Sequence, residues 1–233
     1  MKILVLASCS KIMSNKQIHN LTCKDLDSSE KIDYHLKTSS LKINARELFL
    51  GAVNISLVAA IDQLRQFFDV SYYIVSSGFG LLKEHDRIPP YDCSFMEMNE
   101  KEIIARAEML GIPRQFKDIL AIEQPELLFL ALNKHYLTAL GNWEEMINCA
   151  TITYTPSSSK FVISLPEEYL PQKETMHLPG FPVHNTVSYR GDLLLITKRY
   201  LANSKDPEKT LRELFKNPDE LRYILNSIRQ HGL

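Results

Sequence analysis

Short apolar runs that alternate with helical segments constrain the fold of this chain most strongly. The first run, Lys2–Ala7, has four consecutive aliphatic residues, which is typical of a strand buried on both faces of a sheet. Further strands are expected at Val70–Val75, Glu126–Leu132 and Ala150–Thr155. With helices between them, this βαβαβαβ order predicts a three-layer α/β fold, with a mainly parallel sheet and helices on both faces.

Helical spacing of apolar residues predicts the intervening helices. One is expected from Asn44 to Phe68 and another over Lys134–Ile147. A third begins at Asn99, which forms a capping-box pair with Glu102. Residues 76–95 contain glycines and prolines and are expected to form a loop.

The domain organisation follows from the same pattern. Residues 1–150 form the α/β core, and residues 151–233 form a less regular C-terminal extension that ends in helices beginning at Asp206 and Asn217. Residues 13–40 are polar and weakly periodic, which predicts a loop or flexible insertion on the surface, outside the core.

Composition excludes several classes of protein. The 233 residues are 45% hydrophobic, enough for one buried core, and no apolar run approaches the roughly 20 residues of a membrane helix. The first run lacks the pattern of a signal peptide, so a cytoplasmic location is expected. A net charge of −1 argues against a strong non-specific nucleic-acid binder.

The four cysteines are scattered and form no C-x-x-C pair: Cys9, Cys23, Cys93 and Cys149. They are therefore expected to be reduced thiols, and no zinc site is predicted. No metal and no cofactor is expected, and the oligomeric state is left open.

One candidate loop directly follows the first strand, where ligands bind in open parallel sheets. It reads Ser8-Cys9-Ser10-Lys11. Small residues allow close approach, hydroxyl groups form hydrogen bonds, and Lys11 supplies a positive charge. The alternative is an ordinary turn with an exposed lysine.

A second candidate loop follows the next strand. The right-handed βαβ rule predicts that the two strands are adjacent and parallel, which places Cys9-Ser10-Lys11 beside Ser77-Gly78. Gly78 and Gly80 permit close backbone approach beside Ser77, and a proline pair stiffens the segment before Tyr91 and Asp92. The alternative is a Gly/Pro-rich connector without a ligand.

These motifs carry a family resemblance. The stretch S-G-F-G-L-L-x3-D-R-I-P-P-Y-D resembles the S-G-x-Y-G-x-L…D-x-I-x-P-Y signature of the YaaA peroxide-stress family. Together with C-S-K and A-R-E-L-F-x-G, which contains Arg46, it is still more similar to a related group of bacterial and archaeal proteins. The base-modifying core of archaeosine synthase looks like a distant relative. The resemblance covers roughly residues 1–135, and Phe79 and Asp92 depart from the usual Tyr and Arg of YaaA proteins.

The resemblance implies an enzyme directed at a nucleobase, nucleoside or nucleic acid, through glycosidic-bond or base-modification chemistry. In this hypothesis Lys11 contacts an anionic group, Asp92 acts as a base or stabiliser, and Tyr91 holds or stacks on a base. Cys9 is a candidate nucleophile, with Lys11 as its activator. The substrate-binding candidates are Ser10, Arg46, Ser77, Gly78, Gly80 and Tyr91. The alternative is a non-catalytic, DNA-binding stress-response protein, as attributed to YaaA.

Overall fold

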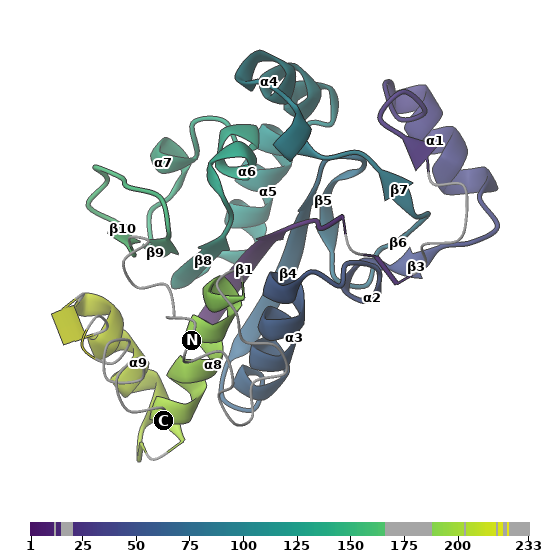
Figure 1. The fold of residues 1–233 in the computed structure, drawn as a ribbon. Coiled ribbons are helices and arrows are strands. Elements are labelled where there is room, and N and C mark those ends of the chain that lie inside the picture. Colours follow the sequence, from purple (N-terminus) through teal and green to yellow (C-terminus); the bar gives the residue numbers. More distant parts are fainter. Residues whose placement is uncertain are drawn as a thin grey trace, which may run out of the picture.

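A computed structural model describes residues 1–11, 13–14, 21–165, 188–202, 204–217, 219–220 and 223. Its centre is a six-stranded mixed sheet in the order β10-β9-β8-β1-β4-β5 (Figure 1). The strands are β1 Lys2–Ser8, β4 Asp69–Ser76, β5 Gly80–Lys83, β8 Leu127–Ala131, β9 Ala150–Thr153 and β10 Val162–Ser164. Only β5 is antiparallel to its neighbour, so the predicted α/β class with a mainly parallel sheet is confirmed.

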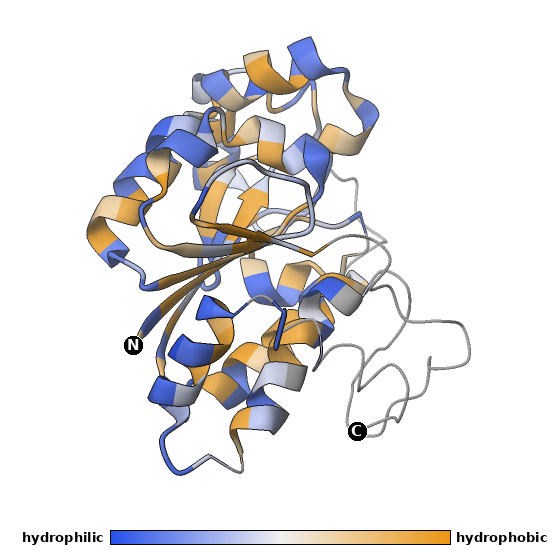
Figure 2. Cartoon of the chain, turned by 90° about the vertical axis from the view of Figure 1, so that its left-hand side faces the viewer, coloured by the Kyte–Doolittle hydropathy of each residue, from blue (hydrophilic) through white to orange (hydrophobic). Residues whose placement is uncertain are grey.

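Helices cover both faces of this sheet. Figures 1 and 2 show α3 and α8 on one face and α4, α5 and α6 on the other, with hydrophobic residues concentrated in the strands between them. The longer helices are α1 Ser29–Thr38, α3 Ala52–Leu64, α4 Glu100–Met109, α5 Ile112–Glu123, α8 Tyr189–Leu201 and α9 Pro207–Lys216. The shorter ones are α2 Ala45–Leu48, α6 Lys134–Ala139, α7 Trp143–Met146 and the 3₁₀ turn η1 Phe95–Glu97.

Two short β-ribbons connect the segment between β1 and α2 with the segment between β5 and η1. β2 Leu21–Thr22 pairs in parallel with β7 Tyr91–Asp92, and β3 Ile43–Asn44 pairs antiparallel with β6 Arg87–Ile88. None of the helices among the described residues has the length and apolar character that a bilayer crossing requires.

The first two long strands lie as predicted. β1 and β4 are adjacent and parallel, with Ser8 opposite Val75. The Cys9 amide extends this ladder by donating to the Val75 carbonyl at 3.0 Å. The Cys9-Ser10-Lys11 loop and the Ser77-Gly78 loop therefore leave the sheet at the same edge.

The single helix predicted from Asn44 to Phe68 is wrong, because the structure contains two helices separated at Phe49–Gly51. Gly51 has extended backbone angles (φ −65°, ψ 150°), and its amide donates to Ser10 Oγ at 3.0 Å. A tertiary hydrogen bond thus replaces helical continuity. The helix predicted over Lys134–Ile147 is likewise divided, at Gly141, whose φ is +72°.

The loop predicted over residues 76–95 contains strand structure, because Gly80–Lys83 turns back to pair with β4. Gly80 occupies the left-handed region (φ +81°), which allows this tight reversal.

Among the described residues of 13–40, the predicted loop is wrong for one helical segment, whereas the predicted surface position agrees with that helix, since α1 has no buried residue. Ser29–Thr38 forms α1, whose N-terminus is capped by the Ser28 side chain. Leu26 is fully buried in the core. Polar residues such as Glu and Lys are good helix formers, so polarity alone did not indicate a loop.

In the C-terminal part, α8 packs on α3, and α9 begins with the Asp206 side chain accepting from the Lys209 amide at 3.0 Å. The start predicted at Asp206 is confirmed. The helix predicted from Asn217 falls mostly outside the described residues.

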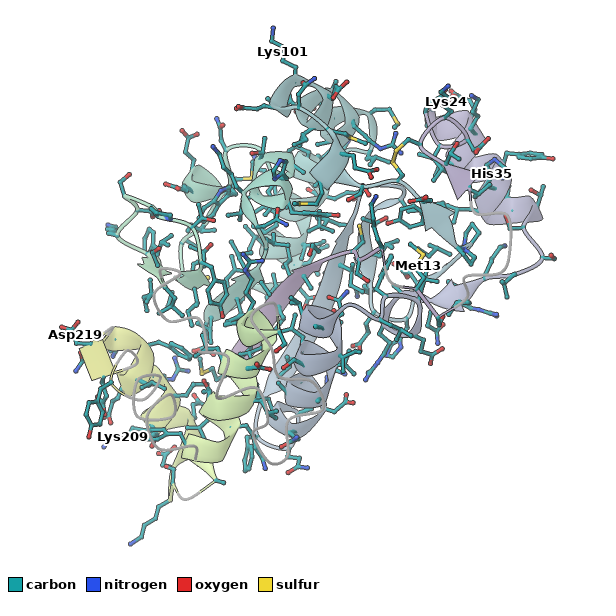
Figure 3. The ribbon with its side chains drawn as sticks, in the orientation of Figure 1. Met13, Lys24, His35, Lys101, Lys209 and Asp219 are labelled. Carbon is teal, nitrogen blue, oxygen red and sulfur yellow. A yellow bond between two sulfur atoms is a disulfide. The ribbon has the colours of Figure 1, made fainter. Side chains whose placement is uncertain are left out.

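The capping box at the start of α4 gives a direct test of the local sequence signal. Asn99 Oδ1 accepts from the Glu102 amide at 3.1 Å, and Glu102 Oε2 accepts from the Asn99 amide at 2.8 Å. We expect Asn99→Ala to lower the free energy of unfolding by about 1 kcal/mol in urea titrations, because the Glu102 amide loses its acceptor. Lys101→Ala, on the exposed side of the same helix (Figure 3), is the control and should change stability little. Equal urea midpoints of unfolding for the two variants would contradict the stabilising role of the Asn99 cap.

Candidate active site

The candidate site lies at the carboxyl edge of the sheet, where β1, β4 and β8 end side by side. Its centre is the buried thiol of Cys9, in the loop after β1. The sulfur lies 3.1 Å from the Tyr136 hydroxyl oxygen and 3.5 Å from Ser77 Oγ. Ser77 follows β4, and Tyr136 stands on α6, which follows β8. Three adjacent strands thus each contribute one side chain to a single cluster.

Further hydroxyl groups, next to this cluster, form hydrogen bonds that connect the end of β4 with β7. Tyr91 Oη and Ser76 Oγ lie 2.7 Å apart, and Ser76 Oγ also accepts from the Gly78 and Phe79 amides at 3.2 and 3.0 Å. Ser77 Oγ donates to the Cys93 carbonyl at 2.6 Å. Ser76, the last residue of β4, and Ser77, the next residue, therefore hold the loop after β4 against β7.

Burial determines the protonation of the two phenols. Burial first, and the nearby Cys9 second, hold the pKa of Tyr91 and of Tyr136 well above the ordinary value for tyrosine. Both side chains are therefore neutral hydroxyl groups at physiological pH. A neutral phenol 3.1 Å from a sulfur atom can donate a hydrogen bond to negative charge that develops there.

Tyr91 is unsuited to stack on a base, which corrects the role expected from the sequence. It is 1% exposed, and its ring is packed edge to face against Phe49 and Phe79. Gly78 lies directly against this ring, since a Cβ there would meet Tyr91 Cδ2 at 2.9 Å. Tyr91 and Gly78 therefore position the loop rather than contact a ligand.

The charged residues form an exposed rim beside Cys9. Lys11 forms an ion pair with Glu97, on η1, and this hydrogen bond is the main cause that raises the pKa of Lys11. The Asp92 carboxylate raises that pKa further through its charge. Lys11 and Asp92 thus belong to one charged group, but the partner in contact with Lys11 is Glu97.

Ser10 occupies the inner side of the same loop. Its hydroxyl accepts from the Gly51 amide, and a Cβ on Gly51 would lie 2.7 Å from the Ser10 Cβ. Asn54, on α3, donates through Nδ2 to the Ser8 carbonyl at 3.2 Å. The start of α3 therefore fixes the path of the Cys9-Ser10-Lys11 loop.

Two sequence candidates lie away from this cluster. Arg46 donates to Glu84 and to Asp62, both at 2.8 Å, and contacts neither Cys9 nor Ser77. Gly80 is placed in the β4–β5 reversal, against the side chain of Gln115. The structure gives both residues a role in the scaffold.

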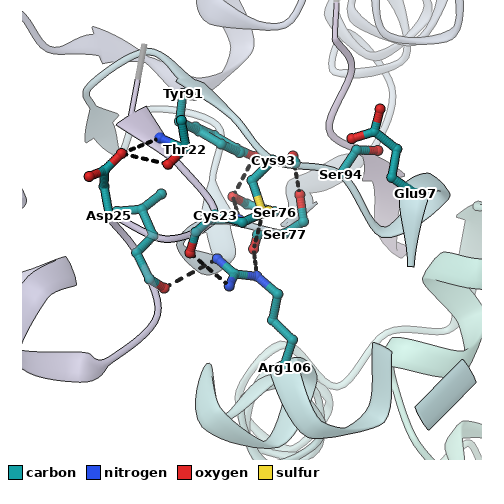
Figure 4. Close-up of a disulfide and its surroundings, with 12 residues drawn as sticks. Thr22, Cys23, Asp25, Ser76, Ser77, Tyr91, Cys93, Ser94, Glu97 and Arg106 are labelled. Atoms are coloured by element: carbon teal, nitrogen blue, oxygen red, sulfur yellow. Dashed lines mark hydrogen bonds between the residues drawn. A yellow bond between two sulfur atoms is a disulfide. The ribbon is translucent and has the colours of Figure 1, made fainter. Parts of the chain in front are cut away.

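Sequence reasoning missed four residues in or around the candidate site: Tyr136, Arg106, Cys93 and Glu97. Tyr136 follows the end of a predicted strand, so the rule that ligands bind at the carboxyl ends of strands would have found it. Arg106, on α4, carries no such signal, yet its guanidinium donates to the carbonyls of Ser77, Cys23 and Leu26 (Figure 4).

The expectation of four reduced thiols is wrong for one pair, because Cys23 and Cys93 form a disulfide with their Cα atoms 4.9 Å apart. They are 70 residues apart in the sequence, so only the fold brings them together. Cys9 and Cys149 are free thiols. Among the residues described, no group of three His, Cys, Asp or Glu side chains is arranged to hold a metal ion.

Fold and site together define an α/β protein with a polar, thiol-containing site at the carboxyl edge of a parallel sheet. Residues 35–153, just over half of the chain, match the model of a family described as a family of unknown function (DUF6884). The chain belongs to this family. The match includes the loop after β4 but not Cys9 or Lys11. No curated protein matches the sequence.

Proposed function

We propose that the chain is an enzyme that acts on a nucleobase, nucleoside or nucleic acid through glycosidic-bond or base-modification chemistry. The observation that carries the proposal is the convergence of Cys9, Ser77 and Tyr136 at the ends of β1, β4 and β8. A buried thiol between two hydroxyl groups is an arrangement that suits a nucleophile better than an ordinary turn. The resemblance to the YaaA family supports the substrate class.

The residues have distinct roles in this proposal. Cys9 is the nucleophile, and Tyr136 donates a hydrogen bond to charge on its sulfur. Ser77, whose hydroxyl donates to the Cys93 carbonyl, positions the thiol from the other side. Asp92, an exposed carboxylate, takes or returns a proton at the substrate. Lys11 binds an anionic group, which displaces the Glu97 carboxylate from its ammonium group. Tyr91 and Ser76 hold the loop in place.

The rim argues against the alternative of a DNA-binding protein without catalytic activity. Phosphate backbones are bound by clusters of Lys and Arg whose counterions are released. Here one lysine faces two carboxylates, those of Glu97 and Asp92. The hydrogen-bonding edge of a nucleobase, which has both donors and acceptors, fits this combination of one ammonium group and two carboxylates better than a phosphate backbone does.

The test is a binding screen followed by turnover assays. Free nucleobases, nucleosides, nucleoside monophosphates, short RNA and DNA, and duplex DNA are compared by thermal shift and calorimetry. We expect one small-molecule or single-stranded class to bind, and Lys11→Ala to weaken that binding at least tenfold. The melting temperature should stay nearly unchanged, because a solvent-exposed ion pair contributes little to stability. Cys9→Ser should retain binding and lose turnover.

Lys101→Ala is the matched control, since Lys101 is an exposed lysine in the first turn of α4 whose side chain points away from the ribbon (Figure 3). Equal affinity of Lys11→Ala and Lys101→Ala would remove Lys11 from the site. Tight, strongly salt-dependent binding of duplex DNA, without product and independent of Cys9, would support the DNA-binding alternative instead.

A further inference from the structure

The Cys23–Cys93 disulfide continues the short parallel pairing of β2 and β7. Leu21 pairs with Tyr91 and Thr22 with Asp92, so the next residues in register are the two cysteines. The covalent bond therefore replaces a third pair in a ribbon that otherwise has two residues on each strand. A ribbon of this length is marginal by itself.

The other contacts of this segment with the core involve Arg106, Leu26 and the partly buried side chains of Ile32 and Leu36 on α1. Arg106 donates to the Cys23 carbonyl at 3.5 Å and to the Leu26 carbonyl at 3.2 Å, and Leu26 is fully buried. The helix that follows Leu26 in the chain, α1, has no buried residue and lies at the outer edge of the molecule (Figure 1). Lys24 and His35 mark this outer position in Figure 3.

The two sulfur atoms differ in their surroundings. Cys23 is half-buried and lines an open cavity of about 470 Å³, whereas Cys93 is only 5% exposed. Cys93 Sγ lies 3.8 Å from the oxygen of the Ser77 carbonyl, and the Arg106 guanidinium donates to that same oxygen. Cys23 is therefore the more accessible of the two cysteines, and the Cys93 sulfur and the Arg106 guanidinium have the Ser77 carbonyl as a common neighbour.

We infer that Cys23–Cys93 is a redox-active disulfide, which a dithiol reductant opens by attack on Cys23 from this cavity. The thiolate of the dithiol bonds to Cys23 Sγ, and the Cys23–Cys93 bond breaks with its electron pair on Cys93 Sγ. Arg106 stabilises that thiolate until it takes a proton from solvent. The second thiol of the reductant then displaces Cys23, which leaves two protein thiols and an oxidised dithiol.

The cavity also selects among reductants. The carboxylates of Asp27, Glu97 and Glu102 line it together with Arg106. An uncharged dithiol such as dithiothreitol should therefore react faster than glutathione, which carries a net negative charge. At matched thiolate concentration and low salt, we expect at least a threefold difference in second-order rate. The difference should shrink in 0.5 M salt.

Reduction also affects the rim of the candidate site. Asp92 directly precedes Cys93, and Ser77, which contacts Cys9, donates to the Cys93 carbonyl. Loss of the covalent bond removes the link between the Asp92 loop and residues 21–28, and leaves the loop held by its two-residue pairing and by the contacts of Tyr91 and Cys93 with Ser76 and Ser77. This part of the inference rests on the proposed function. The redox chemistry and the release of residues 21–28 do not.

The experiment uses the full chain, oxidised with diamide or reduced with dithiothreitol. Alkylation in denaturant is expected to label two of the four cysteines, Cys9 and Cys149, before reduction, and all four afterwards. Hydrogen–deuterium exchange should rise at least tenfold in peptides covering residues 21–28 and 89–94 on reduction. Peptides from β8 should not change.

Matched variants complete the test. Cys23→Ser/Cys93→Ser should show the fast exchange without reductant, and Cys149→Ser should behave like wild type. If the double variant fails to fold by circular dichroism, reduced wild type supplies the same comparison. Labelling of all four cysteines after oxidation, or equal exchange in the two redox states, would overturn the inference. Altered exchange with unchanged ligand affinity would refute only the effect on the site.

Discussion

Replacing both Arg46 and Arg65 with Met is expected to lower the free energy of unfolding by about 3–5 kcal/mol, the cost of leaving a buried carboxylate without its cations. Glu84 is 6% exposed and accepts from Arg46 Nη1 at 2.8 Å and from Arg65 Nη1 at 3.2 Å. The His85 ring, 3.8 Å away, is the remaining basic group in contact among the described residues. Urea titration of purified variants measures the loss, and Met keeps the aliphatic part of each side chain.

A third substitution separates charge from packing. Adding Glu84→Met to the double variant should recover most of the loss, because a buried ion pair replaced by apolar residues of similar volume is often neutral in stability. Each single Arg variant should cost less than the double one, since one cation remains on Glu84. If the triple variant is no more stable than the double one, packing rather than the uncompensated charge explains the effect.

The same variants test the candidate role of Arg46 in ligand binding. Its partners, Glu84 and Asp62, place it in the scaffold. Arg46→Met should therefore bind the ligand identified by the screen with wild-type affinity under conditions in which it is folded. A selective loss of affinity would return Arg46 to the site.

Substituting Gly191 is expected to disrupt the contact between α8 and α3. A Cβ on this residue would lie 2.8 Å from the Val53 carbonyl oxygen and 2.8 Å from the Leu57 amide nitrogen. Both are backbone atoms of α3, so no side-chain rotation relieves the overlap, and the helices must separate. We expect Gly191→Ala to lower the free energy of unfolding by about 1–3 kcal/mol, and Gly191→Val by about 3 kcal/mol or more.

The sign of this effect is informative, because helix propensity acts in the opposite direction. An alanine in a helix interior is favoured over glycine by about 1 kcal/mol, so a stabilised Gly191→Ala variant would show that the two helices are not in close contact. Tyr200→Ala, at a 40% exposed position on the same helix, controls for changes in α8 itself. Its midpoint in urea should stay close to that of wild type.

The two halves of the site differed in how far they could be predicted. The loops after β1 and β4 were found because strands β1 and β4 are apolar runs with polar residues directly after them. Their parallel adjacency follows from the handedness of βαβ units. Cys9 and Ser77 were therefore placed together correctly. The contact between Lys11 and Glu97 was not predicted, because it depends on how η1 crosses the edge of the sheet.

The sequence by itself determined the elements whose cause is local. Period and apolar content define β1, β4 and β8, and the side chains of Asn99 and Asp206 define where α4 and α9 begin. Each of these signals acts within a few residues, through burial of one face or through a hydrogen bond to a nearby amide. Such causes can be identified without knowing where the rest of the chain lies.

Only the tertiary structure decided the features that depend on distant partners. The interruption before α3 exists because the Gly51 amide binds Ser10, and the disulfide exists because β2 and β7 pair in register. Tyr136 reaches Cys9 because β8 lies beside β1. In each case the free energy comes from a contact between segments 41 to 127 residues apart, and no local pattern encodes which segments meet.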